Sequence, residues 1–310
     1  MDDVTDTVFR RVVADCAAPD YSMTEFVNVD GLCSPGRKNL MRKLDSSLDT
    51  APVIAQIWGK KPENFKQIAS EIADGTIAGF VGIDLNFGCP AKSEIRAGCC
   101  SALQKPELRG DAAAIIEATL EGAGSFPVSF KTRLGFSKLD YSWHEFLLHY
   151  KPWMLTVHVR TTKEMSKVPA RWSDIAPILK LRDDISPETK IIMNGDIMNR
   201  EHAEEIVTTY GVDGVMIGRG VFQNPYCFGE NADEKWANTE EKARISMLQW
   251  HIQTHQQQYP NDERPFNPLK KFAKIYISDF PGASELRAKI MKTTSSHEAL
   301  ELLDSVKTAA

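Results

Sequence analysis

The sequence predicts an α/β protein, a (β/α)8 TIM-type barrel followed by an all-helical C-terminal domain. Short β-rich runs alternate with helical stretches from the start of the chain to about residue 228. Continuous apolar strands separated by helices are typical of a parallel sheet that is covered on both faces. This spacing also suits a doubly wound sheet, but a ring of strands brings together the polar residues that follow nearly every strand. These residues are Glu25, Gln56, Asn86, Lys131, His158, Asn194 and Arg219.

The β-rich runs predict seven strands, one fewer than a complete barrel needs. They are Ser22–Asn28, Val53–Trp58, Phe80–Asn86, Val128–Arg133, Met154–Arg160, Ile191–Gly195 and Gly214–Gly218. The segment from Asp2 to Cys16 is typical of a loop followed by a helix. We therefore expect the first strand to be missing before Met1, which would leave two exposed sheet edges.

Beyond residue 228 the strand patterns stop and helices dominate. The predicted helices are Glu240–Tyr259, Pro268–Asp279, Gly282–Lys292 and Ser296–Ala309, with a loop from Pro260 to Pro268. The sequence therefore predicts two domains, a catalytic barrel over residues 1–228 and a helical domain over residues 229–310.

The charge of the chain limits the kinds of partner that it can bind. A net charge of −5 argues against non-specific binding of nucleic acid by the whole surface. Between Arg264 and Lys292, however, seven basic residues face only two acidic ones. Such clusters are often solvated helix faces, but this one is also compatible with a local site for a polyanion. It contains Lys270, Lys271 and Lys274.

The cysteines and the N-terminus predict a cytoplasmic protein without a metal or a membrane partner. No CxxC pair suggests zinc, and the adjacent Cys99 and Cys100 do not suit a structural disulfide. The N-terminus lacks the basic and apolar regions of a signal peptide. No apolar run reaches the roughly 18 residues that a membrane helix needs. We expect a monomer.

The segment Asp84-Leu85-Asn86-Phe87-Gly88-Cys89-Pro90 is the most informative stretch of the chain. It predicts a buried strand that stops at a Gly-Cys-Pro turn, and the C-terminal ends of barrel strands carry catalytic residues. Pro90 restricts Cys89 to extended backbone angles. The thiol is a candidate acid or nucleophile, or else a small buried residue in a tight turn.

Other strand ends carry groups that suit an anionic cofactor. Lys131 could stabilise an anion such as a reduced flavin ring, or form a surface ion pair. His158 and Arg160 are two residues apart and so lie on the same side of their strand. Gln56 could hydrogen-bond a heterocyclic ring. The turns Asn194-Gly195-Asp196 and Gly218-Arg219-Gly220 follow the last two strands, where barrels commonly bind phosphate.

Seven motifs occur in a fixed order along nearly the whole chain. They are Val4-Thr5-Asp6 with Phe9-Arg10, Thr24-Glu25-Phe26-Val27, the Asp84–Pro90 segment, Lys131-Thr132-Arg133, Val157-His158-Val159-Arg160-Thr161, Asn194-Gly195-Asp196-Ile197 and Gly214-Val215-Met216-Ile217-Gly218-Arg219-Gly220. In this order and spacing they resemble the tRNA-dihydrouridine synthase family. The Thr24–Val27 motif, the length and the C-terminal segment look most like the bacterial subgroup that acts at uridine 16 in the D-loop.

The resemblance implies a barrel with FMN across its mouth and a helical domain that helps to hold tRNA. NADPH would reduce the flavin, which passes a hydride to C6 of a flipped-out uridine, and Cys89 would deliver a proton to C5. An ordinary thiol pKa of about 8.5 keeps Cys89 protonated at neutral pH. The resemblance places FMN against Met1, Gln56, Lys131, His158, Asn194, Gly195, Asp196, Gly218 and Arg219. It places the substrate against Glu25, Asn86, Arg160, Lys270, Lys271 and Lys274.

The chain departs from the family pattern at two places. Met1 coincides with the Met of an Ala-Pro-Met stretch that ends the family's first strand, so the Ala-Pro is missing. Two cysteines, Cys99 and Cys100, replace a more usual run of small residues, and we assign them no catalytic role.

Two other functions remain open at this point. One is an FMN barrel oxidoreductase of the dihydroorotate dehydrogenase type that acts on a free pyrimidine, although such a substrate needs no basic helical domain. The other is a tRNA-binding protein that lost its activity with the first strand, although the chain keeps Cys89, Lys131, His158 and Arg160.

Overall fold

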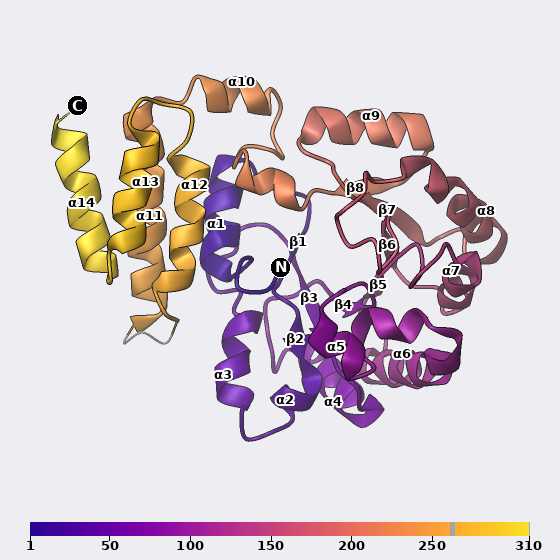
Figure 1. The fold of residues 1–310 in the computed structure, drawn as a ribbon. Helices are drawn as coiled ribbons and strands as arrows, with labels where there is room; N and C mark the ends of the chain where they lie inside the picture. Colours follow the sequence, from indigo (N-terminus) through magenta and orange to yellow (C-terminus); the bar gives the residue numbers. More distant parts are fainter. Residues whose placement is uncertain (261–263, 310) are drawn as a thin grey trace.

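The computed structural model describes residues 1–260 and 264–309 and shows one parallel sheet beside a group of helices (Figure 1). The strand order is β1-β3-β4-β5-β6-β7-β8, and β2 also pairs with β3. The strands are β1 (Ser22–Met23), β2 (Val27–Asn28), β3 (Val53–Trp58), β4 (Gly82–Asn86), β5 (Val128–Arg133), β6 (Met154–His158), β7 (Lys190–Asn194) and β8 (Gly214–Met216).

The predicted strand Ser22–Asn28 is divided into β1 and β2 because a side chain interrupts the ladder. The hydroxyl of Thr24 accepts a hydrogen bond from the backbone N–H of Gln56 at 3.0 Å, in place of a backbone carbonyl. Other predicted strands end earlier than expected. The N–H of Arg160 donates to the carbonyl of His158 at 2.7 Å, a tight turn that ends β6 at His158.

Within the described part of the chain the sheet is open, because β1 is the edge strand on one side and β8 is the edge strand on the other. All three residues of β8 are partly exposed. This arrangement confirms the predicted fold class, a TIM-type α/β sheet without a strand that joins its two edges.

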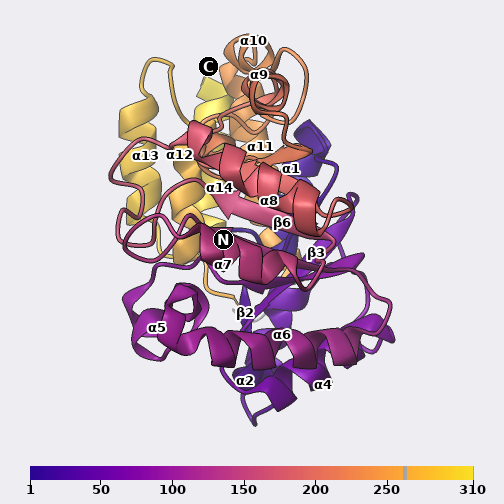
Figure 2. The same ribbon diagram turned by 90° about the vertical axis from the view of Figure 1, so that its right-hand side faces the viewer.

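Helices cover the outer face of the sheet. In α4, Pro62 occupies the first turn, and Phe65, Ile68 and Ile72 lie one helical turn apart and are buried. Helices α4 and α6 pack side by side in both views (Figures 1 and 2). The helices of this part are α1 (Thr7–Cys16), α2 (Val29–Leu32), α3 (Arg37–Met41), α4 (Pro62–Ala73), α5 (Lys92–Arg96), α6 (Arg109–Ala123), α7 (Tyr141–Leu148), α8 (Ala176–Ile185) and α9 (Arg200–Tyr210).

The C-terminal helices form a second hydrophobic core. They are α10 (Ala232–Ala237), α11 (Glu241–Gln258), α12 (Ala273–Tyr276), α13 (Ala283–Lys292) and α14 (Ser296–Ala309). The predicted helix Pro268–Asp279 is instead the 3-10 segment η7 (Asn267–Phe272) followed by the short α12. Residues 261–263 of the predicted loop Pro260–Pro268 lie outside the described residues.

Helix α1 belongs to this second core although it precedes the sheet in the sequence. It lies beside α11 and α12 (Figure 1), and the ring of Phe9 stacks on that of Phe272 with centroids 4.8 Å apart. Asp6 caps α1 by accepting the N–H of Phe9 at 2.8 Å. The N-terminal segment thus connects the helical part with the sheet. Over the described ranges, no helix is long and apolar enough to span a membrane.

Candidate active site

The loop that carries Cys89 is held by side chains at the C-terminal end of β4. The carbonyl oxygen of the Asn86 side chain accepts the N–H groups of Gly88 and Cys89, at 3.1 and 2.9 Å. Arg133, at the end of β5, donates from Nε to the carbonyl of Gly88 at 2.8 Å. The position of the thiol is therefore set by two neighbouring strands. Asn86, expected to bind substrate, has its side-chain oxygen engaged in this loop.

The Cys89 thiol is half-buried and more acidic than the sequence predicts. A hydrogen bond from the thiol of Cys100 is the largest cause, and it outweighs burial and lowers the pKa of Cys89 to about 7. The expectation of an ordinary thiol pKa was therefore wrong. A pKa near neutrality keeps the protonated thiol available at physiological pH.

A buried polar network lies beneath this loop and includes a carboxylate that sequence reasoning missed. Asp84, in the middle of β4, accepts hydrogen bonds from Gln56 at 2.8 Å and from Ser129 at 2.7 Å. The amide of Asn86 donates to that of Gln56 at 3.1 Å. An acidic residue between the apolar Ile83 and Leu85 was the signal that could have revealed it.

Lys131 is the charged group of this network that stays available to a ligand. Burial, with a smaller contribution from Arg133, lowers its pKa to about 8, while the carboxylate of Asp84 opposes this change. Burial likewise raises the pKa of Asp84 to about 6. Among the described residues, the ammonium group of Lys131 has no hydrogen-bond partner. It can therefore donate to an anionic or acceptor-rich molecule at the mouth.

His158, at the end of β6, carries an unpaired N–H. Its Nε2 accepts a hydrogen bond from Arg160 at 3.4 Å, so the proton lies on Nδ1, which is buried and unpartnered within the described residues. Burial is the largest cause that lowers the pKa of His158, to about 2, and four cations act in the same direction. The ring is neutral at physiological pH. These cations are Arg133, Lys131, Arg160 and Arg219.

The turn after β7 joins two of these cations. Asp196 accepts hydrogen bonds from Arg160 and, at 2.8 Å, from Arg219. Gly195 has a φ of +129°, which favours glycine, and a Cβ there would lie 3.2 Å from that of Ala170. The amide of Asn194 donates to the carbonyl of Met216 at 2.8 Å and so connects β7 with β8. The structure thus brings Asn194, Gly195, Asp196, Gly218 and Arg219 into one region, as predicted for a phosphate site.

Glu25 occupies a different setting from the one expected of a substrate-binding residue. Its carboxylate is fully buried and forms a two-pronged ion pair with Arg264, at 2.8 and 3.1 Å. Arg264 also lies 3.3 Å from the carboxylate of Asp6. Met1 lies nearby, where Glu25 and Lys131 both act on its amino group. Sequence analysis counted Arg264 with the basic cluster near the C-terminus, but the structure buries it against a partner 239 positions away.

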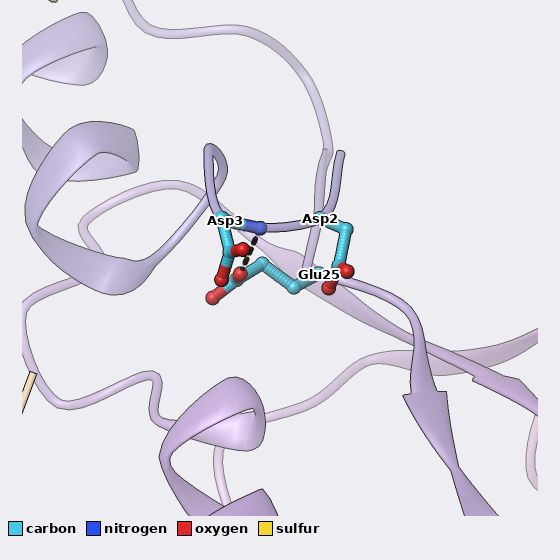
Figure 3. Close-up of side chains that lie close together, drawn as sticks. All are labelled: Asp2, Asp3 and Glu25. Atoms are coloured by element: carbon cyan, nitrogen blue, oxygen red, sulfur yellow. Dashed lines mark hydrogen bonds between the residues drawn. The ribbon is translucent and has the colours of Figure 1, made fainter. Parts of the chain in front are cut away.

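Asp2, Asp3 and Glu25 form an acidic group near the N-terminus (Figure 3). The N–H of Asp3 donates to Glu25 at 2.6 Å, shown as a dashed line. Lys43 pairs with Asp2, and Arg264 neutralises Glu25. Because basic side chains of the protein already form ion pairs with these carboxylates, we assign no metal ion to this group.

The three lysines predicted to contact tRNA lie on η7 and α12, and they differ in their surroundings. Lys270 donates to the carbonyl of Thr293, and Lys271 donates to that of Asp3. Lys274 is exposed and, over the described ranges, takes part in no hydrogen bond or ion pair. Lys274 is therefore the member of the group whose charge is free for an external anion.

Comparison with known proteins identifies the family. A family model described as dihydrouridine synthase matches residues 1–310. The chain belongs to the dihydrouridine synthase family. The resemblance read from the motifs is thereby confirmed.

Similar curated proteins cover almost the whole chain. The probable tRNA-dihydrouridine synthase 2 of Bacillus subtilis (strain 168) is 42% identical over 309 residues, which are 98% of this chain and 91% of that protein. The probable tRNA-dihydrouridine synthase of Staphylococcus aureus (strain COL) is 43% identical over 309 residues, 98% of this chain and 90% of that protein.

Solved structures share the fold at low sequence identity. Morphinone reductase superposes with a TM-score of 0.52 at 11% identity, covering 76% of this chain and 82% of that one. A structure of morphinone reductase in complex with tetrahydroNAD gives 0.50 at the same identity and coverage. These similarities show a common barrel architecture.

Proposed function

We propose that this protein is a tRNA-dihydrouridine synthase that uses FMN and NADPH to reduce a uridine of tRNA to 5,6-dihydrouridine. The observation that carries the proposal is the half-buried Cys89 after the end of β4, with Lys131 on the neighbouring strand β5 and the unpaired N–H of His158 at the end of β6. The names of the curated relatives, which are tRNA-dihydrouridine synthases, support the same reaction.

The residues of the mouth fit an anionic flavin nucleotide. A buried donor without a partner costs about 1–3 kcal/mol, so the Nδ1–H of His158 favours an acceptor at this place. Lys131 would face the ring system, with Gln56 and Met1 near it. Asn194, Gly195, Asp196, Gly218 and Arg219 would hold the phosphate. When bound, FMN supplies the hydride that reaches C6 of uridine.

Cys89 would act as the general acid. Its S–H bond breaks as the C5–H bond of the pyrimidine forms, and the electron pair stays on the sulfur as a thiolate. A pKa of about 7 suits this task, because a proton donor is most effective when its pKa lies near the working pH. Asn86 would orient Cys89 through the loop, and Glu25 would act through Arg264 rather than touch the base. Arg160, expected to bind substrate, is almost completely buried and donates to Val168 and Asp196, so it would act by holding the turn after β7.

The substrate would be a uridine that has left the base stack of the tRNA. We propose a barrel unit over residues 1–228 and a helical tRNA-binding unit over residues 229–310, with α1 packed against the latter. We further propose uridine 16 in the D-loop as the target, and a cytoplasmic monomer. Mapping dihydrouridine in tRNA from cells with and without the protein tests the target position.

The experiment that tests the function starts with the purified protein. We expect a yellow protein that releases FMN on denaturation and forms dihydrouridine in unmodified tRNA when NADPH is added. A colourless protein that FMN cannot reconstitute would contradict both this function and a flavin oxidoreductase acting on a free pyrimidine. A yellow protein that reduces free pyrimidines but not tRNA would favour the latter.

A pair of lysine variants tests where the flavin binds. Lys131→Met removes a donor at the mouth and should weaken FMN binding about 10- to 100-fold, the effect of one missing hydrogen bond to a charged group. Lys138→Met removes an exposed lysine outside the strands and serves as the matched control. Equal FMN affinity in the two variants would place the flavin away from Lys131.

Lys274 offers a sharp test of the tRNA-binding face. Lys274→Glu should weaken tRNA binding and make the plot of log K against log salt less steep, by about 0.7–0.9 for each tRNA phosphate that the variant no longer neutralises. Lys242→Glu changes an exposed lysine on α11 by the same charge and is the control. An unchanged slope for Lys274→Glu would move the binding face elsewhere.

A further inference from the structure

A loop at the mouth of the sheet carries exposed cations that the proposed reaction does not use. It consists of residues 161–171, which follow β6, and is called the rim loop below. Lys163 and Lys167 are exposed there, and so are the apolar side chains of Met165 (41%) and Val168 (37%). Within the described ranges, neither ammonium group takes part in a hydrogen bond or an ion pair. Both charges are therefore free for an external anion.

The acidic residues of this loop and of its neighbour are already neutralised. Glu164 is the single carboxylate of the rim loop, and it pairs with Arg171. Asp140 is the single carboxylate of residues 134–140, the loop after β5, and it pairs with Arg109 at 2.8 Å. Because the acids are paired while the two lysines are not, this part of the mouth attracts anions.

Arg133 joins the rim loop to the loop that carries Cys89. Its Nε donates to the carbonyl of Gly88, the residue before Cys89, at 2.8 Å. Its Nη1 donates to the carbonyls of Thr161 and Met165, at 3.2 and 2.9 Å. One buried guanidinium group thus holds both loops, and it places the rim loop beside the thiol that would protonate the base.

Other hydrogen bonds fix the backbone of the rim loop against the protein. The N–H of Lys163 donates to the carbonyl of Phe136 at 3.0 Å, and the carbonyl of Val168 accepts from Nε of Arg160 at 2.6 Å. The ammonium group of Lys105 lies 4.6 Å from the centre of the Phe136 ring, so a further cation borders the same loops. A surface that is already fixed binds a ligand without the cost of ordering it first.

The side chains of the rim loop suit a strand of RNA. Lys163 and Lys167 are four positions apart, with Met165 midway between them. Unpaired ammonium groups bind the phosphates of a nucleic acid. Methionine is one of the apolar residues that nucleic-acid-binding proteins insert between bases. A uridine that leaves the stack exposes the faces of the bases on either side of it, and an apolar side chain can cover such a face.

We propose that the rim loop binds the tRNA strand beside the target uridine, with Lys163 and Lys167 on its phosphates and Met165 against a base that the flipped-out uridine leaves exposed. The inference rests on the proposed function, because it takes tRNA as the substrate. The rim loop would be a contact surface in addition to the one at Lys274. It acts in binding and does not touch the reacting atoms.

The first test is tRNA binding by the double variant Lys163→Gln with Lys167→Gln, measured by fluorescence anisotropy of labelled, unmodified tRNA at several salt concentrations. Each lost contact to a single-stranded phosphate should weaken binding about 5-fold at about 0.1 M salt and make the plot of log K against log salt less steep by about 0.7. For the pair we expect about 25-fold weaker binding and a change in slope of about 1.4.

The matched control is the double variant Lys151→Gln with Lys180→Gln. Lys151 precedes β6, at the opposite edge of the sheet, and Lys180 lies on α8. Both are exposed, and their removal changes the net charge by the same amount. This control should bind tRNA like the unchanged protein. Equal affinities and equal slopes in the two double variants would overturn the proposal.

Steady-state kinetics separate a binding role from a loss of structure. In the rim-loop double variant the KM for tRNA should rise, while kcat at saturating tRNA and the FMN content stay unchanged, because the two lysines contact neither the flavin nor the reacting atoms. A lower kcat with an unchanged KM would overturn the proposal.

Crosslinking tests where the strand lies. The photoreactive residue p-benzoylphenylalanine in place of Met165 should crosslink to the nucleotides on either side of the modified uridine, as mapped by primer extension. The same residue in place of Lys151 should give no crosslink to tRNA. Crosslinks from position 165 that are confined to another arm of the tRNA would overturn the proposal.

The binding measurement needs no turnover, so it distinguishes the two proposals. If the unchanged protein binds tRNA but forms no dihydrouridine, the proposed function fails, and the comparison of the two double variants still decides the role of the rim loop. If the unchanged protein binds no tRNA, both proposals are overturned.

Discussion

Cys89→Ala is expected to lower the rate of dihydrouridine formation by about 10²- to 10⁴-fold, the usual contribution of a general acid. The substitution removes the S–H that would protonate C5. It leaves Lys131, His158 and the turn after β7 in place, so FMN content and the reduction of flavin by NADPH should be unchanged. The measurement is the dihydrouridine content of tRNA over time, compared with single-turnover bleaching of the flavin absorbance by NADPH.

Cys33 offers the matched control for this variant. It is a partly exposed thiol at the end of α2 with no part in the polar network of the mouth, and Cys33→Ala should retain full activity. Full turnover in Cys89→Ala would remove Cys89 from the acid role. Loss of FMN together with activity would instead show that Cys89 is needed for the structure of the site.

Arg264→Leu is expected to lower the free energy of unfolding by about 3–5 kcal/mol, the usual result of removing one partner from a buried ion pair. The substitution leaves the carboxylates of Glu25 and Asp6 buried without their cation. Both belong to the N-terminal segment and to the connection between β1 and β2, so the variant should also loosen the packing of the C-terminal helices against α1. Urea unfolding followed by circular dichroism measures the effect.

The loss of stability in this variant should depend on pH. Burial already raises the pKa of Asp6 to about 6, although Arg264 opposes the change. Without Arg264 the pKa of Asp6 rises further. A carboxyl whose pKa is raised in the folded state binds more protons when folded than when unfolded, so stability falls as pH increases through that interval. The difference between Arg264→Leu and the unchanged protein should therefore be larger at pH 8 than at pH 5.

Arg200 provides the control for charge removal. It forms only surface ion pairs, with Glu204 and Glu230, so Arg200→Leu should change the free energy of unfolding by less than about 1 kcal/mol. The double variant Glu25→Leu with Arg264→Leu should be less destabilised than Arg264→Leu alone, since one unpaired charge is removed. Equal stability of Arg264→Leu and Arg200→Leu would show that the buried cluster does not hold the two parts together.

Most of the architecture could be predicted from the sequence because the relevant signals are local. The strand that ends at Asn86, the Gly-Cys-Pro turn and the two glycine-containing turns after β7 and β8 are properties of consecutive residues. Hydrophobic period and turn chemistry determine such elements before any long-range contact forms. Errors occurred where a side chain replaced a backbone partner, as when the Thr24 hydroxyl divided the first predicted strand into β1 and β2.

Only the tertiary structure decided which of the predicted groups interact. Glu25 and Asn86 were expected at the substrate, but Glu25 pairs with Arg264 and Asn86 holds the Cys89 loop. Partners of this kind come from distant parts of the chain, and their charges are felt only after burial removes water. The same holds for the unpaired Nδ1–H of His158, since whether a nitrogen lacks a partner is a property of the packed site.

The cysteines show most clearly the difference between what the sequence predicts and what the folded structure decides. By itself, the sequence determined that the chain belongs to a barrel family, that a thiol ends one strand, and that basic residues gather near the C-terminus. It could not distinguish Cys99 from Cys100, two adjacent residues of one type. The folded backbone separates them, with a φ of +51° at Cys100 and −108° at Cys99, because the angles of a turn depend on how distant segments are held against each other.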